Sequence, residues 1–320
     1  MQGLVTIFGG SGFVGAQVVR ALAKRGLRLR VAVRNPGRGY RLRMLGDVGQ
    51  IEVVQANIRN PASIARAMDG AQACVNLVGV LYEAGRQKFQ AVHAMGARQV
   101  AQAAAAQGVQ RLIHVSAIGA DPQSGSKYAR SKAMGESAVR EVFPGAVILR
   151  PSIVFGQEDD FFNRFATMAS LSPVLPLIGG GHGLFQPVFV GDVAAAVAGA
   201  VMDPDTAGRT YELGGPGIYS FKALMQLMAR ETGRRPLLVP VPFPIASLIG
   251  LGGDMAAWLI APPLTSDQVA LLRTDNVVSP GAAGLADLGV QPTALEAILP
   301  TYLYRYRKGG QYAEAVARGA

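Results

Sequence analysis

Cysteine and histidine are scarce in this sequence, and their scarcity argues against two kinds of site. The 320 residues include one cysteine, Cys74, which lies inside an apolar stretch typical of a strand. A single cysteine cannot form an intrachain disulfide, and the apolar residues around it indicate that it is buried. The low cysteine content is typical of proteins in a reducing compartment. The three histidines, His93, His114 and His182, do not have the spacing of metal ligands, so we expect no metal site.

Long uninterrupted apolar segments are also missing. The longest apolar candidate, Leu237–Leu264, is interrupted by prolines and by Asp254, so it cannot form a straight membrane-spanning helix. Because an apolar strand begins within a few residues of Met1, we expect no signal or transit peptide. Half of the residues are apolar, which is enough for one large domain or two smaller ones.

Acidic residues are few relative to basic ones, and the formal net charge is +10. Nine basic residues and no acid lie between Arg20 and Arg43. This run fits a solvated face beside a phosphate-binding site, an anionic partner protein or an anionic membrane lipid surface. No recognised nucleic-acid-binding motif accompanies it, so we expect no nucleic-acid partner.

A glycine-rich turn near the N-terminus is the strongest signal in the chain. An apolar strand-like run ends at Phe8, and helical periodicity begins at about Phe13. In a dinucleotide-binding turn, Gly9 would allow the tight bend, Gly12 the close approach of a pyrophosphate, and Gly15 the packing of helix on strand. The pyrophosphate would lie at the helix N-terminus, where N–H groups and the helix dipole favour negative charge. The other cofactor-binding residues expected in this turn are Ser11, Phe13 and Val14. The alternative is a similar turn that has lost its ligand.

The second strand, Leu29–Val33, ends in a basic residue instead of an acidic one. NAD-selective sites usually have Asp or Glu here, which accepts hydrogen bonds from the ribose 2′-OH. In this chain Arg34 follows the strand, and a guanidinium pairs well with a 2′-phosphate. We therefore predict NADPH over NADH, with Arg38 as a weaker candidate for the same contact. The alternative for Arg34 is a solvated surface arginine.

Two later strands are expected to add cofactor contacts. After Ile51–Gln55, Asn57 either faces the adenine or caps the turn before the next helix. The apolar run Ala73–Val80 predicts a buried strand that brings Val78 and Gly79 beside the cofactor ribose. Alternation of strands and helices of this kind implies a parallel sheet with right-handed crossovers.

A serine, a tyrosine and a lysine, which follow a predicted helix over Phe89–Gln107, have the arrangement of a proton-transfer site. Tyr128 and Lys132 are four residues apart, so on a helix they face the same side. An ammonium beside a phenol favours the phenolate, which lets the tyrosine act as general acid or base. Ser116, at the end of the strand Arg111–Ser116, would bond the same oxygen, and Lys132 would also hold the nicotinamide ribose. The alternative is an ordinary helix start with a Tyr/Lys pair.

Together these motifs resemble the extended and atypical short-chain dehydrogenase/reductase superfamily. The residues that carry the resemblance are Gly9–Gly15, Val33–Pro36, His114–Ser116, Tyr128–Lys132 and Arg150–Gly156. Family members use the last stretch, here with Pro151 and Ile153, to line the nicotinamide pocket. We expect an α/β fold, a Rossmann-type doubly wound parallel sheet with a smaller C-terminal α/β domain. The NADP-binding domain would cover residues 1–157, with 185–215 returning to it, and a docking or substrate-type domain would cover 158–320.

Within this superfamily, the chain is most similar to the NADPH-binding accessory subunit of respiratory complex I (NADH:ubiquinone oxidoreductase), in a bacterial version. The similar stretches are Lys132–Arg140, Phe155–Ala166, Pro263–Leu272 and Asp275–Val278. The resemblance implies tightly bound NADPH with a structural role and no appreciable turnover. It also implies docking with other complex I subunits on the peripheral arm, near the quinone region, on the cytoplasmic side of the bacterial inner membrane.

The serine, tyrosine and lysine keep two other functions open. In a soluble NADPH-dependent reductase or a sugar-nucleotide epimerase-like enzyme, Tyr128 would move the proton and Lys132 would tune it. A regulator that senses NADPH without catalysis would use the same cofactor contacts. The chain beyond Phe155 has few polar groups that could orient a sugar nucleotide, which disfavours the epimerase.

The C-terminal half contains three stretches whose structure or role the sequence predicts less specifically. Phe161–Met168 predicts an aromatic helical face, either for core packing or for a partner. Leu175–Gly181 is expected to be a Pro/Gly-rich loop. Ile245–Ile260, which contains the only tryptophan, Trp258, is either a core helix, a substrate lid, or a surface against neighbouring subunits or the bilayer edge.

Overall fold

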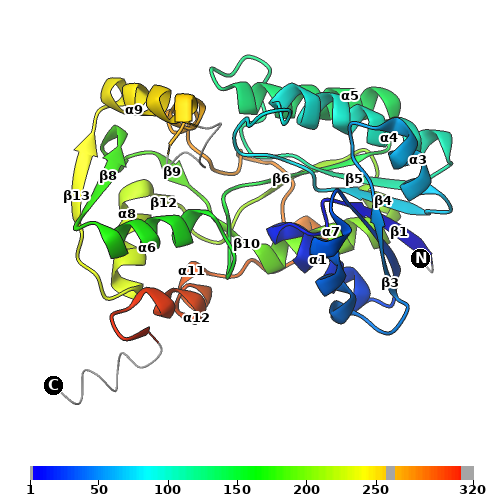
Figure 1. Ribbon diagram of the computed structural model, residues 1–320, viewed down its shortest axis with the longest axis horizontal. Coiled ribbons are helices and arrows are strands. Elements are labelled where there is room, and N and C mark those ends of the chain that lie inside the picture. Colours follow the sequence, from blue (N-terminus) through cyan, green and yellow to red (C-terminus); the bar gives the residue numbers. More distant parts are fainter. Residues whose placement is uncertain (1–2, 257–263, 311–320) are drawn as a thin grey trace. The chain divides into compact units, whose positions relative to one another are not determined.

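A seven-stranded parallel sheet is the centre of the first of two units in the computed structural model, which describes residues 3–256 and 264–310 (Figure 1). The sheet order is β11-β6-β5-β4-β1-β2-β3. The strands are β1 (Leu4–Phe8), β2 (Arg28–Val33), β3 (Ile51–Gln55), β4 (Ala73–Asn76), β5 (Arg111–Val115), β6 (Val147–Pro151) and β11 (Thr210–Leu213). The order reverses between β1 and β4, as in a doubly wound Rossmann-type sheet, so the predicted fold class is confirmed.

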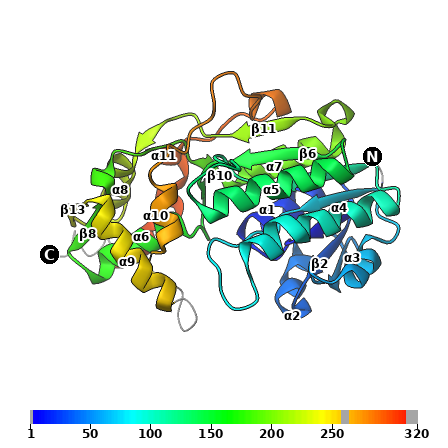
Figure 2. The same ribbon diagram turned by 90° about the horizontal axis from the view of Figure 1, so that it is seen from above.

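Helices cover both faces of this sheet. The α-helices of the unit are α1 (Phe13–Ala23), α2 (Pro36–Gly39), α3 (Pro61–Met68), α4 (Gly96–Ala106), α5 (Lys127–Val142) and α7 (Val190–Met202). Shorter turns are η1 (Tyr40–Leu45), the π-helical η2 (Gln90–Met95), η4 (Pro204–Thr206) and η5 (Ala286–Leu288). Figure 2 shows α4 and α5 running side by side, and with α3 they enclose a core that includes Phe8, Val100 and Leu112. Helices α1 and α7 pack against each other on the opposite face.

Two predicted elements of this unit differ from those observed. The predicted strand Ala73–Val80 ends at Asn76, because the Asn76 Oδ1 accepts a hydrogen bond from the Val78 N–H at 3.2 Å and turns the chain out of the sheet. The predicted continuous helix over Phe89–Gln107 begins instead with the π-helical turn η2. Cys74 is fully buried in β4, as predicted.

The second unit comprises Ser152–Phe189, Gly214–Val278 and the residues from Pro292 onward. Its strands are β7 (Val154–Phe155), β8 (Val174–Ile178), β9 (Leu184–Phe185), β10 (Val188–Phe189), β12 (Tyr219–Ser220) and β13 (Leu237–Val241). Its helices are α6 (Phe161–Leu171), α8 (Phe221–Glu231), α9 (Phe243–Ala256), α10 (Ser266–Leu271), α11 (Leu295–Ile298) and α12 (Pro300–Leu303), with the turns η3 (Gly179–Gly181) and η6 (Tyr304–Tyr306). The strands pair two by two, β7 with β10, β9 with β12 and β8 with β13.

The expected loop at Leu175–Gly181 is wrong, because most of it is strand β8. This strand pairs in parallel with β13, with Pro176 opposite Val239. A proline is tolerated here because each strand of a two-stranded sheet keeps one edge without ladder hydrogen bonds.

The aromatic face of α6 packs into the core of this unit. Phe162 is fully buried, and Phe161 and Phe165 are partly buried against the same cluster. The Phe161 ring lies 5.1 Å from that of Phe162 and 6.2 Å from that of Phe221, centroid to centroid. Of the two interpretations of this stretch, core packing is therefore the one observed.

Helix α9 has an exposed apolar face and is not a buried core helix. The exposed large apolar side chains among its described residues are Ile245, Leu248, Ile249 and Leu251. Trp258 and the rest of the predicted stretch beyond Ala256 lie outside the described residues. None of the helices in the described parts of the chain combines the length and apolar character needed to span a bilayer.

Asp159 connects the start of α6 with the C-terminal helices of its unit. Its buried carboxylate accepts hydrogen bonds from the N–H groups of Gly156 (3.1 Å) and Phe162 (2.7 Å). The Tyr302 hydroxyl donates a further one at 2.5 Å. Burial raises the pKa of Asp159, and the hydrogen bond from Tyr302 opposes that rise most.

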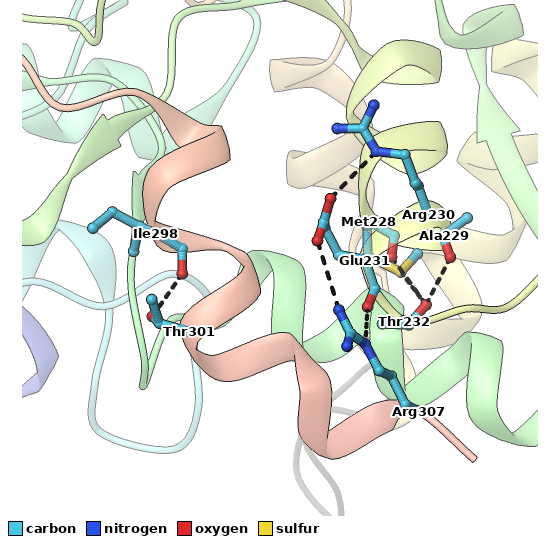
Figure 3. A network of polar contacts seen from close by, with 8 residues as sticks. All are labelled: Met228, Ala229, Arg230, Glu231, Thr232, Ile298, Thr301 and Arg307. Atoms are coloured by element: carbon cyan, nitrogen blue, oxygen red, sulfur yellow. Dashed lines mark hydrogen bonds and ion pairs between the residues drawn. The ribbon is translucent and has the colours of Figure 1, made fainter. Parts of the chain in front are cut away.

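Arg307 belongs to a basic, aromatic segment, Tyr302–Lys308, and bonds back to α8 of its own unit (Figure 3). The Arg307 Nε donates to the Glu231 carbonyl at 2.7 Å, at the end of α8. The Glu231 carboxylate lies 3.9 Å from Arg307 and 3.3 Å from Arg230. The Thr232 hydroxyl donates to the Met228 carbonyl at 2.9 Å and so closes the same helix end.

Replacement of Tyr302 by phenylalanine tests the Asp159 contact. Tyr302→Phe leaves a buried carboxylate without one donor, so we expect the free energy of unfolding to fall by about 1–3 kcal/mol. Tyr304→Phe, at a more exposed position in the next turn, should change it by less than about 0.5 kcal/mol. Urea unfolding of both variants measures the difference, and equal small effects would contradict the assignment.

Candidate dinucleotide-binding site

The glycine-rich turn leads directly from β1 into α1. Gly9 has a φ of +83°, in the region that favours glycine. A Cβ on Gly15 would overlap the carbonyl oxygen of Gly9, and a Cβ on Gly10 would lie 2.5 Å from Val31 Cγ1. Gly10, which the spacing did not single out, is therefore also required by packing. The tight bend and the close contact of helix and strand are both present.

Gly12 differs from its neighbours because no described residue of the unit requires it to be glycine. Its φ of −81° suits any residue, and a Cβ there would meet only the Gly9 carbonyl oxygen, at an ordinary 3.5 Å. It is the N-cap of α1, and in the described part of the chain no side chain caps this end and no acid lies in the first turn. Ser11 precedes it, and Phe13 and Val14 open the helix. This arrangement leaves room and N–H donors for a pyrophosphate.

A cavity of about 320 Å³, lined mainly by polar and basic residues, lies at the carboxyl ends of β2 and β3. Its lining residues are Arg34, Gln55, Ala56, Asn57, Asn60, Ser63 and Arg66. Arg34 is exposed, and one of its guanidinium nitrogens donates to Gln87 Oε1 at 2.8 Å. Arg66 on α3 adds a second guanidinium that the sequence pattern did not reveal. Arg38 is exposed on α2 and does not line this cavity.

Asn57 forms a local turn as well as lining the cavity. Its Oδ1 accepts a hydrogen bond from the Arg59 N–H at 3.1 Å. The cap of α3 is a different residue, Asn60, which accepts from the Ser63 N–H at 3.2 Å. Contact of Asn57 with adenine stays a prediction.

The segment after β4 runs against the glycine turn. A Cβ on Gly9 would lie 3.1 Å from the Leu77 carbonyl carbon and from the Val78 nitrogen. A Cβ on Gly79 would lie 3.3 Å from the Lys132 Nζ. Val78 and Gly79 thus lie between the pyrophosphate end and the tyrosine–lysine end of the candidate site.

The candidate proton-transfer residues lie beyond β4 along the carboxyl edge of the sheet. They are Ser116, Tyr128 and Lys132. Tyr128 and Lys132 are on α5, and the Lys132 Nζ is 5.8 Å from the centre of the Tyr128 ring. The buried Ser116 follows β5, and its Oγ has no hydrogen-bond partner among the described residues. The Lys132 Nζ donates to the carbonyl of Val115 at 3.3 Å, one residue before Ser116.

Lys132 is a buried cation with an acidic neighbour one helical turn away. Burial lowers its pKa from 10.5 to about 8, and the charge of Glu136 opposes this shift. Glu136 is bonded by Arg150, at 3.0 Å and 2.7 Å, and Arg150 also contacts Glu212 at 3.4 Å. A series of alternating charges therefore runs from Lys132 and Glu136 on α5 through β6 to β11, and it stabilises the buried ammonium.

Two buried histidines surround this group, although the sequence pattern assigned them no role. The His93 Nε2 accepts a hydrogen bond from the Val80 N–H at 3.0 Å, and its Nδ1 contacts the Ser131 Oγ at 2.8 Å. The His114 Nδ1 contacts the Asn76 Nδ2 at 3.2 Å. Burial and the charge of Lys132 lower the pKa of both rings, so both are neutral.

The two remaining predicted residues fall in different units. Pro151 ends β6, where its carbonyl accepts from the Ile118 N–H at 3.0 Å. Ile153 belongs to the second unit, and its N–H donates to Asn276 Oδ1 at 3.1 Å. Apart from Ile153, every predicted site residue is therefore in the first unit.

The residues of this edge fit a dinucleotide. Gly12 leaves space at an uncapped helix end, and polar and basic residues, Arg34 and Arg66 among them, line the neighbouring cavity. The Ser116 hydroxyl is buried without a partner in the described chain. Chemically, the ammonium of Lys132 beside the phenol of Tyr128 suits either proton transfer at the phenol oxygen or hydrogen bonding to a ribose.

Comparison with known proteins agrees with this geometry. Residues 5–214 match the NAD dependent epimerase/dehydratase family. A mitochondrial protein of Arabidopsis thaliana, NADH dehydrogenase (ubiquinone) 1 alpha subcomplex subunit 9, is 37% identical over 97% of this chain and 80% of its own length. The ceramide reductase of Caulobacter vibrioides is 32% identical over 80% of this chain and 78% of its own length.

The fold recurs in solved structures. Triphenylmethane reductase of Citrobacter sp., solved with NADP(H), has a TM-score of 0.73 at 20% identity, over 93% of this chain and 99% of that one. At this identity the similarity concerns the fold alone. The chain belongs to the NAD dependent epimerase/dehydratase family and, within it, to the family of the complex I alpha subcomplex subunit 9 proteins.

Proposed function

We propose that this chain is an accessory subunit of a bacterial respiratory complex I, in which it holds NADPH as a structural cofactor. The observation that carries the proposal is the similarity to the Arabidopsis subunit, 37% identity over nearly the whole chain. This similarity covers the second unit as well as the nucleotide-binding fold. The family match over residues 5–214, in contrast, leaves out much of the second unit. Other complex I subunits are then its partners, at a peripheral site on the cytoplasmic side of the membrane.

The NADPH contacts that we propose follow the carboxyl edge of the sheet. The N–H groups at Gly12–Gly15 take the pyrophosphate, and Arg34 takes the 2′-phosphate. Tyr128 and Lys132 hold the nicotinamide ribose, with Val78 and Gly79 beside it. When bound, NADPH supplies a hydride donor, whereas the residues of this chain supply binding, orientation and a proton site at Tyr128.

The apolar face of α9 suits burial against a neighbouring subunit. Four large aliphatic side chains are exposed there, and isolated exposure of such residues is common but a continuous helical face is not. We assign the face to a protein partner rather than to anionic lipid, because α9 carries no lysine or arginine.

A second candidate function is an NADPH-dependent reductase. It is favoured by the assembled Tyr128 and Lys132 pair and by the similarity to a ceramide reductase. In such an enzyme Tyr128 gives its proton to the substrate oxygen, and Lys132 stabilises the phenolate that remains. The two candidates use the same cofactor contacts and differ in whether a substrate reaches Tyr128.

The 2′-phosphate contact is tested by charge reversal. Arg34→Glu replaces an attractive contact by repulsion, so we expect NADPH to bind about tenfold to a hundredfold more weakly and NADH binding to change little. Arg38→Glu makes the same change of charge four residues further on, outside the cavity, and should have a much smaller effect. Calorimetric titration of each variant with NADPH and with NADH measures these affinities. If both variants lose NADPH affinity equally, the cause is a general charge effect instead of a 2′-phosphate contact.

Migration of the native protein tests the choice between subunit and enzyme. After gentle solubilisation of membranes and separation by size, we expect the chain to travel with NADH:quinone oxidoreductase activity. The Tyr128→Phe variant should travel in the same way, because only one hydroxyl is lost.

A soluble enzyme would give the opposite pattern. The chain would remain small and soluble, and Tyr128→Phe would lose most of the NADPH-dependent reduction of its substrate. Either finding would contradict the accessory-subunit proposal.

A further inference from the structure

His93 is a buried side chain that bonds both to the segment after β4 and to the helix that carries Tyr128 and Lys132. It lies in η2, the π-helical turn before α4. Such turns are rare and often occur at functional sites. The backbones of η2 and α5 touch at this point, since a Cβ on Gly135 would overlap the His93 carbonyl oxygen.

The hydrogen bonds of His93 have only one consistent direction. Nε2 accepts from the Val80 N–H, so in the neutral ring Nδ1 carries the proton. Nδ1 therefore donates to the Ser131 Oγ, and the Ser131 hydroxyl donates to the Tyr128 carbonyl at 2.7 Å. The chain of donors runs without a break from Val80 to Tyr128.

Ring contacts reinforce this connection. The His93 ring stacks on Phe89, with centroids 5.4 Å apart and planes at 23°. It also meets the Tyr128 ring edge to face, with centroids 5.4 Å apart. A Cβ on Gly79 would lie 3.7 Å from the His93 Nε2 and 3.3 Å from the Lys132 Nζ, so the three groups converge.

We infer that His93 is a positioning residue for the nicotinamide–ribose end of the site. The inference rests on the proposed function, because it assumes that Tyr128, Lys132 and Gly79 hold that ribose. His93 fixes the distance between the segment after β4 and α5, and it takes no part in the contacts at the pyrophosphate or at Arg34.

A comparison of two ligands separates this role from a merely structural one. NADPH reaches both ends of the site, whereas adenosine 2′,5′-bisphosphate reaches only the adenosine end. In the full chain, His93→Leu removes both hydrogen bonds, so NADPH should bind about tenfold more weakly. The affinity for adenosine 2′,5′-bisphosphate should stay within about twofold of that of the unaltered chain. Among the described residues, His93 contacts none of those that would bind this ligand, so the substitution does not change the entropy lost when those side chains are ordered.

Conservative replacements provide the controls. In His93→Gln the amide oxygen can accept from the Val80 N–H, so most of the NADPH affinity should return. Ser131→Ala cuts only the connection to Tyr128 and should weaken NADPH binding less than His93→Leu does. If His93→Leu does not fold, Ser131→Ala decides, and unchanged NADPH affinity in that variant would overturn the inference.

Two results with His93→Leu contradict the role of His93, and a third result separates that failure from failure of the proposed function. Equal loss of both ligands in His93→Leu would indicate a structural residue only. Unchanged NADPH affinity would show that the ribose end does not depend on it. If the unaltered chain binds no NADPH, the proposed function fails first, and that result is visible without any variant.

Discussion

The close approach of α1 to the end of β1 is the constraint on which the candidate site depends. A side chain at Gly15 would overlap the backbone of the preceding turn, so only glycine lets the helix begin there. The helix N-terminus is thereby held at the point where the strand order reverses, between β1 and β4. Because all strands of this sheet are parallel, their carboxyl ends lie along one edge, and Arg34 and Ser116 follow two of these strands onto it.

The opposite end of the site depends on a buried cation. Lys132 keeps its place because Glu136 faces it from the same helix and Arg150 and Glu212 continue the alternation of charge. A buried ammonium beside a phenol serves a reductase and a ribose-binding subunit equally well. The proposed function therefore rests on the relatives and on the full length of the similarity, whereas the site geometry fits a dinucleotide without distinguishing the two candidate functions.

Strands bounded by turn residues could be predicted from the sequence, and several lie within one residue of the bounds expected, such as Leu29–Val33 and Ile51–Gln55. The wrong predictions occur where contacts between residues far apart in the sequence determine the local structure. Strand β8 exists because β13 pairs with it, although the two are far apart in the sequence. In the site, the glycine turn and the tyrosine–lysine pair have local spacing that the sequence reveals. Arg66 and His93 have none, because only the folded sheet brings α3 and η2 to its edge.

NADPH that is held without being consumed can be detected in the assembled complex. The most direct measurement of the proposed role is the amount and redox state of NADPH in respiratory complex I purified from cells that express this chain, before and during oxidation of NADH. We expect one NADPH per copy of the chain, which stays bound and reduced while NADH is turned over. A complex without NADPH, or one whose NADPH is oxidised and released during turnover, would contradict a structural role for the cofactor.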